Sequence, residues 1–145
     1  MPSRSISRDI VVDAPPAAVF AVLTDPRAHP DFDGSGMLRS AISGPDRLTE
    51  GSRFGMAMSI GVPYRIQNTV VEFEQDRRIA WRHLGRHRWR YELEPAGAGT
   101  RVTESFDLST SPAARLLELL GWRDRGARAI ERTLPRLKAL VESRA

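Results

Sequence analysis

The chain of 145 residues contains no cysteine. Disulfide bonds, thiolate nucleophiles and metal sites built on thiolate ligands are therefore excluded. The sequence also lacks any run of about 18 apolar residues, the length that a membrane-spanning helix requires. Its opening segment has no apolar stretch of the kind found in secretory signal peptides. We therefore expect a cytoplasmic protein without integral membrane association.

Lysine is nearly absent as well, although the chain is basic. Lys138 is the only lysine among 22 basic residues, and the net charge of +4 accompanies a pI near 10.5. Such a charge would suit nucleic acid or an anionic membrane surface. No helix-turn-helix, zinc-finger or RNA-binding aromatic signature accompanies it, so we expect solvated arginines on outer faces and no nucleic-acid partner. An interaction module that uses the basic surface stays open as an alternative.

Recognisable catalytic motifs are missing too. The sequence has no nucleophile elbow, no phosphate-binding P-loop, no dinucleotide-binding glycine motif and no His-Glu-x-x-His pair. His83 and His87 flank a predicted turn, which places them at the partly exposed end of a sheet. No third metal ligand stands at a recognisable spacing from them, and His29, which precedes a proline, is expected at the surface. We predict neither a metal nor a cofactor.

What the chain does contain is a globular composition, with 41% hydrophobic and 28% charged residues. We expect one domain over residues 1–145. Its most extended pattern is a predicted helix over residues 111–142, with Ser111 as the cap and Pro112 as the first helical residue. Gly121, Gly126 and Pro135 predict a bend between a short first piece and a longer second piece.

The longer piece carries a single apolar stripe, which must cover another element. The stripe consists of Ile130, Leu134, Leu137 and Val141. Upstream of it the sequence predicts mainly strands, over residues 5–13, 37–43, 51–60 and 64–74, with Val71 and Phe73 pointing inward. Two short helices are predicted near the N-terminus, one after Pro16 and one that Asp25 caps and His29-Pro30 ends.

The clearest alternation of apolar and polar residues runs over residues 79–108. A hairpin with a three-residue loop, Leu84-Gly85-Arg86, keeps each alternating set on one face of the sheet. The pairs that this register predicts are His83–His87, Trp81–Trp89, Ile79–Tyr91, Tyr91–Glu104, Trp89–Phe106 and Leu93–Val102. The sheet is therefore expected to have an aromatic inner face and an arginine-rich outer face.

Several segments together resemble a known superfamily. Residues 10–26, IVVDAPPAAVFAVLTDP, are similar to the opening of START-like (SRPBCC) proteins of the polyketide cyclase/dehydrase type, and later segments such as VEFE, RIAWR and YELEP resemble further landmarks. The resemblance implies an α+β helix-grip fold. In that fold a curved antiparallel sheet, two short helices near the N-terminus and a long C-terminal helix enclose a cavity, mostly for apolar or aromatic small molecules.

The inward residues are the candidate ligand-binding set, although each alone would serve equally well as plain core packing. The set comprises Met56, Met58, Trp81, His83, Trp89, Tyr91, Glu104, Phe106, Ile130 and Leu134. We expect the protein to bind a small hydrophobic ligand, lipid-like or polyketide-like, as a monomer or homodimer.

An enzyme of the polyketide cyclase/aromatase type is the alternative, with Glu104, Tyr91 and His83 as candidate acid–base groups. Glu104 lies in an otherwise apolar set, so a buried position there requires a partner or a proton. A bulge near Thr103 would instead turn Glu104 toward solvent.

Overall fold

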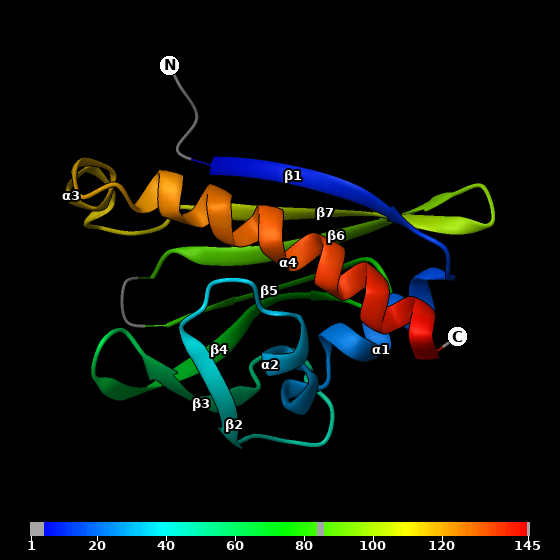
Figure 1. The fold of residues 1–145 in the computed structure, drawn as a ribbon, viewed down its shortest axis with the longest axis horizontal. Coiled ribbons are helices and arrows are strands. Elements are labelled where there is room, and N and C mark those ends of the chain that lie inside the picture. The colour runs from blue at the N-terminus through cyan, green and yellow to red at the C-terminus, as the bar shows by residue number, and fades with distance from the viewer. Residues whose placement is uncertain (1–4, 84–85, 145) are drawn as a thin grey trace.

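The computed structural model describes residues 5–83 and 86–144. Seven antiparallel strands form one curved sheet in the order β1-β7-β6-β5-β4-β3-β2, with short helices near the N-terminus and a long C-terminal helix (Figure 1). The strands are β1 (Ser5–Val12), β2 (Leu38–Ser43), β3 (Arg53–Ser59), β4 (Pro63–Glu74), β5 (Arg78–Arg82), β6 (Arg88–Ala96) and β7 (Gly99–Asp107). The helices are α1 (Pro16–Leu23), η1 (Pro26–Ala28), α2 (His29–Phe32), α3 (Ala114–Leu119) and α4 (Trp122–Arg144). The predicted helix-grip fold is confirmed.

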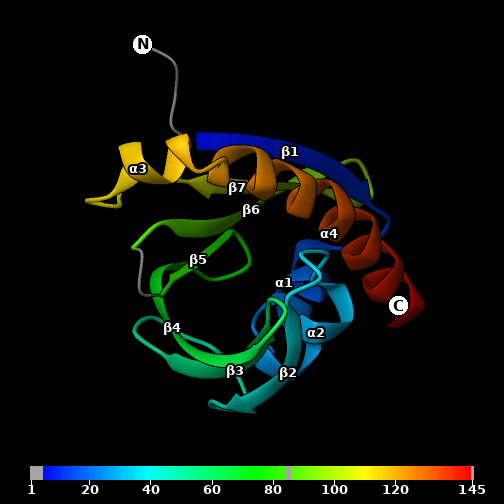
Figure 2. The same ribbon diagram turned by 60° about the vertical axis from the view of Figure 1, so that its left-hand side comes forward.

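The sheet curls around its own inner face. Figure 2 shows it bending from β1 and β7 at the top to β3 and β2 at the bottom, with α4 along the first pair and α2 near β2. Among the described helices, none is long and apolar enough to cross a membrane.

The N-terminal helices start as predicted, but a further helix follows the second one. Pro16 begins α1, and the Asp25 side chain caps η1 by accepting a hydrogen bond from the Arg27 amide at 3.0 Å. The helix that Asp25 caps, η1, ends before His29-Pro30 as predicted, but a further helix, α2, begins at His29. Pro30 stands in the first turn of α2, where a proline loses no hydrogen bond. His29 is consequently carried inward, and only 3% of its surface is exposed, in contrast to the surface position expected.

The predicted register of the aromatic strands is confirmed. Trp81 pairs with Trp89 and Ile79 with Tyr91 across β5 and β6. Tyr91 pairs with Glu104 across β6 and β7, and this ladder runs without a bulge, so Glu104 points inward. Of the predicted loop, Leu84 and Gly85 lie outside the described residues, while Arg86 has a positive φ of 60°.

One strand differs from its prediction. A bulge between Val70 and Glu72 makes Val71 the extra residue of β4, so Val70 takes the buried inward position that was expected for Val71. Phe73 does point inward, and its ring meets that of Phe20 in α1 at a centroid distance of 5.5 Å. The bulge lets the Glu72 side chain turn outward.

The outer face of the sheet carries arginines that are paired with carboxylates. Arg88 and Arg90 each contact Glu72 at 2.7 Å, and Arg90 lies 3.4 Å from Asp107. Hydrogen bonds from Arg90, followed by those from Arg88, lower the pKa of Glu72 to about 2 despite partial burial. Much of the basic character of this face is therefore neutralised locally.

The C-terminal helix breaks once, at Gly121, which has a φ of 80°. The predicted division into a short piece and a longer piece is confirmed. Ser111 does not cap the helix, which begins at Ala114. The Ser111 hydroxyl instead accepts a hydrogen bond from the Ala113 amide at 3.2 Å, in the turn that precedes α3.

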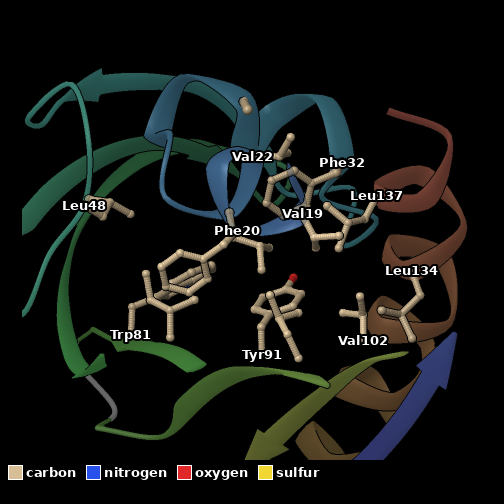
Figure 3. Packing of buried hydrophobic residues seen from close by; sticks show 14 of the residues in the cluster. Val19, Phe20, Val22, Phe32, Leu48, Trp81, Tyr91, Val102, Leu134 and Leu137 are labelled. Carbon is tan, nitrogen blue, oxygen red and sulfur yellow. The ribbon is translucent and has the colours of Figure 1, made fainter. Parts of the chain in front are cut away.

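Gly126 and Pro135 lie inside α4 and do not end it. A Cβ atom at Gly126 would overlap the Phe106 ring, so this glycine lets α4 pack closely on β7. The predicted stripe is buried, and Leu134 and Leu137 point from α4 toward Val102 and Phe32 (Figure 3). By contrast, the leucines at the end of α3 are exposed, Leu119 by 79%.

Replacing Leu134 by alanine is expected to lower the free energy of unfolding by about 2–5 kcal/mol, because the side chain is 3% exposed and its removal leaves a cavity. Leu119→Ala, on the exposed end of α3, is the matched control and should change it by less than about 0.5 kcal/mol. Urea unfolding measures both. Equal midpoints for the two variants would contradict the covering role of α4.

Candidate functional site

A cavity of about 130 Å³ lies between the inner face of the sheet, α2 and α4. Most of the predicted ligand-binding residues line it, namely Met56, Met58, Trp81, His83, Trp89, Tyr91 and Glu104. The other three do not appear among its described lining residues. Phe106 packs under α4 against Trp89, with ring centroids 4.4 Å apart, and Ile130 and Leu134 belong to the neighbouring core.

Sequence reasoning missed several residues that complete the lining. They include His29, Phe32, Asp33, Tyr64, Asn68, Trp122, Ala129 and Thr133. Tyr64 and Asn68 follow the alternation of β4, and Ala129 and Thr133 stand four residues apart beside the apolar stripe of α4. The period of two of a strand and the helical period would therefore have identified these four residues. His29, Asp33 and Trp122 lie at helix ends, where no period applies.

One wall of the cavity is an aromatic stack. The His29 ring lies on Trp81 with centroids 4.7 Å apart and planes 28° apart, and Trp81 meets Tyr91 at 5.5 Å. The His29 Nε2 atom lies 2.9 Å from the Leu23 carbonyl oxygen. Burial lowers the pKa of His29 to about 4, so this ring is neutral and serves as a packed aromatic group.

Carboxyl groups and a phenol gather at one end of the cavity. Glu104 and Tyr91 are each 2% exposed, and their register places them opposite each other. Burial raises the pKa of Glu104 to about 8. A hydrogen bond from Tyr91 acts in the opposite direction, and the nearby Asp33 raises the pKa of Glu104 as well. Burial also raises the pKa of Asp33. Glu104 therefore holds a proton at neutral pH.

The Asp33 carboxyl is positioned by a loop that is fastened to α4. The Gly34 amide donates a hydrogen bond to the Thr133 hydroxyl at 2.8 Å, and a Cβ atom at Gly34 would overlap the α4 backbone at Arg132. Asp33 Oδ1 accepts a hydrogen bond from the Ser35 amide at 2.7 Å. The sequence indicated only a loop here, whereas the structure shows that this loop is held against α4.

Two histidines stand at the opposite end. The rings of His83 and His87 lie 5.0 Å apart, and His87 is only 3% exposed, so the partly exposed position expected for it is wrong. Burial lowers the pKa of both, that of His87 to about 4. Within residues 5–83 and 86–144, no group of three His, Asp or Glu side chains is arranged to hold a metal ion.

Strand register sets the order of these groups along the cavity. The row that contains Tyr91 and Glu104 comes first, the Trp81–Trp89 pair forms the next row, and His83 and His87 follow beyond it. The cavity thus has an aromatic middle and two polar ends. Such an arrangement can hold a flat apolar ring, orient its polar substituents and move a proton at Glu104.

Comparison with known proteins identifies related sequences. A sequence model of the family described as polyketide cyclase / dehydrase and lipid transport matches residues 3–142. The uncharacterized protein Rv0088 of Mycobacterium tuberculosis is 39% identical over 138 residues. That match covers 91% of this chain but 62% of the relative, so the chain spans under two thirds of the length of this curated relative.

Solved structures share the fold at low sequence identity. Protein NE0264 from Nitrosomonas europaea has a TM-score of 0.72 and 18% identity, over 99% of this chain and 98% of that one. The polyketide-cyclase-like protein Cgl2372 from Corynebacterium glutamicum has a TM-score of 0.66 and 20% identity, over 99% and 95% of the chains. At this level of identity the likeness concerns the fold alone.

The protonated state of Glu104 predicts how stability depends on pH. The folded pKa of about 8 exceeds the ordinary value of 4.5, so the folded state binds the proton more tightly and stability falls as pH rises from about 4.5 to 8. The slope for one group is at most about 1.4 kcal/mol per pH unit. Glu104→Gln should remove this contribution, so its stability relative to wild type should rise steadily between pH 5 and pH 8.

Urea unfolding at intervals of one pH unit measures this difference. The buried histidines contribute equally to both proteins and cancel in the comparison. Glu50→Gln, at an exposed position, is the control and should stay within about 0.5 kcal/mol of wild type. Parallel curves for wild type and Glu104→Gln would show that Glu104 is ionised in the folded protein.

Proposed function

This chain belongs to the polyketide cyclase / dehydrase and lipid transport family, and on that premise we propose that it binds a small hydrophobic or aromatic ligand in the cavity between the sheet and α4. The observation that carries the proposal is the lining of this cavity. Aromatic and methionine side chains supply apolar surface, while Glu104 and Tyr91 converge as polar groups at one end. Ligand sites typically combine an apolar lining with a few placed polar groups.

The volume of the cavity limits the size of the ligand that it can hold. Its volume of about 130 Å³ is close to that of engineered apolar cavities of about 150 Å³, which bind benzene. Typical sites for larger ligands measure roughly 300–1,000 Å³. A compound with one ring therefore fits the present conformation, whereas a long acyl chain requires the cavity to widen.

A second candidate function is acid–base catalysis of the polyketide cyclase/aromatase kind. The observation in its favour is a buried carboxyl group, Glu104, whose pKa of about 8 keeps it protonated near neutral pH beside Tyr91 and Asp33. A group of this kind can give a proton to a ligand oxygen and take it back. The alternative of an interaction through the basic surface gains no support from the arginine–carboxylate pairs of the outer face.

Toluene is a suitable first probe, because it is a single ring without hydrogen-bonding groups. We expect saturable binding, seen as a change in the emission of Trp81, Trp89 and Trp122, which all line the cavity. A rise in the unfolding temperature with toluene concentration should accompany it, since the ligand binds only the folded state.

A cavity-filling variant tests the location. Ala129 lines the cavity from α4, so Ala129→Leu should occupy the space, keep the protein folded and weaken toluene binding at least tenfold. Ala139→Leu, on the exposed side of the same helix, is the matched control and should bind toluene like wild type. Equal affinity in both variants would place the bound toluene elsewhere and contradict the proposal.

A further inference from the structure

The cavity of this arginine-rich protein contains no cationic side chain among its described lining residues. The chain has 22 lysines and arginines, yet the ionisable side chains at the cavity are carboxyl groups, histidines and tyrosines. An anionic ligand would bring a negative charge beside the carboxyl groups of Asp33 and Glu104, and no cationic side chain among the described lining residues would offset the loss of hydration. Arg136 stands outside this lining, where it donates a hydrogen bond to the Asp33 carbonyl oxygen at 3.1 Å. The lining therefore disfavours carboxylate and phosphate ligands.

Side chains at both ends of the cavity carry buried polar atoms that have no hydrogen-bond partner among the described residues. At one end, Oε1 of Glu104 is buried and has no partner among the residues that the structure describes. At the other end, Nδ1 of His83 and both ring nitrogens of His87 are also buried without a hydrogen-bond partner among the described residues. Buried polar atoms are rarely left unpaired, because each unpaired group costs roughly 1–3 kcal/mol.

The two ends are separated by the aromatic middle of the cavity. Tyr91 and His87 stand four residues apart, which corresponds to roughly 13 Å along an extended chain, and the Trp81–Trp89 pair lies between them. Because the side chains of both ends line one cavity, a molecule that fills it meets polar side chains at each end and aromatic side chains in between.

The protonation states indicate what these ends exchange with a ligand. Burial holds the pKa of His87 down to about 4 and raises that of Glu104 to about 8, so both side chains are uncharged near pH 7. A neutral imidazole offers one nitrogen as an acceptor, and a protonated carboxyl group offers one donor and one acceptor. Neither His87 nor Glu104 therefore offers a charge that would favour a charged ligand.

We propose that the cavity binds an uncharged single-ring aromatic compound with polar groups at both ends. A hydroxyl group of the ligand donates to His87 or His83, and a hydroxyl or carbonyl oxygen at the other end meets Glu104. The ring itself lies against Trp81 and Trp89. This inference rests on the proposed function, because it names the class of ligand for the same cavity.

Four compounds that share one ring test the proposal at pH 7. They are toluene, the dihydroxy compound 4-(hydroxymethyl)phenol, the anion 4-methylbenzoate and 4-methylbenzylamine, which is a cation at this pH. The dihydroxy compound should bind at least tenfold more tightly than toluene, because it pairs both polar ends. The anion and the cation should bind more weakly than toluene, and calorimetric titration measures all four affinities.

Variants of the two ends show whether the preference arises there. His87→Leu and Glu104→Leu should each reduce the ratio of the two affinities, dihydroxy compound over toluene, at least threefold. Glu104→Gln keeps a donor and an acceptor at the same place and should retain the preference. This conservative variant also covers the case in which Glu104→Leu fails to fold.

The outcomes separate this inference from the function on which it rests. If toluene binds in the cavity but the dihydroxy compound binds no more tightly, the proposed class of ligand is wrong and the binding function stands. Tighter binding of the benzoate or the benzylamine would overturn the inference in the same way. If none of the four binds, the binding function and the inference fall together.

Discussion

The packing of α4 against the inner side of the sheet is the constraint on which the cavity depends. Leu134 and Leu137 are buried in the shared core, and Gly126 lets the helix approach the Phe106 ring. Farther along, Thr133 accepts the hydrogen bond from the Gly34 amide. The contact of Gly126 with Phe106 fixes how close the helix lies to the sheet. The hydrogen bond to Thr133 holds the loop that brings Asp33 to the cavity.

Removal from water then determines the charge of the interior. The same loss of hydration raises the pKa of a buried acid and lowers that of a buried base, so Glu104 gains a proton and His29 and His87 lose theirs. A single physical cause thus leaves polar groups of opposite character uncharged in one cavity. These groups keep their ability to donate and accept hydrogen bonds, which is the basis of selectivity for neutral ligands.

The sequence allowed the strand register and the inner face of the sheet to be predicted, because a period of two leaves few pairings that keep Trp81, Trp89 and Glu104 on one side. It failed where local rules compete with packing. The proline after His29 was predicted to end the helical segment, whereas it stands in the first turn of the next helix. The bulge in β4 buries Val70 in place of Val71, and the alternation of apolar and polar residues gives no sign of it. Whether a residue at a helix end, such as Asp33, lines the cavity depends on the angle at which the helix packs on the sheet. No short sequence pattern predicts that angle.

The distribution of charge connects these features to function. Arginines on the outer face pair with carboxylates such as Glu72, so their charge is balanced where water also screens it. Inside, the carboxyl group of Glu104 has no described cationic partner and is instead protonated. A buried arginine would have ionised this carboxyl group and made the cavity a site for charged ligands. Because no arginine is among the described residues that line the cavity, Glu104 stays uncharged, as does the buried His87. Uncharged groups of this kind select ligands by shape and hydrogen bonding rather than by charge.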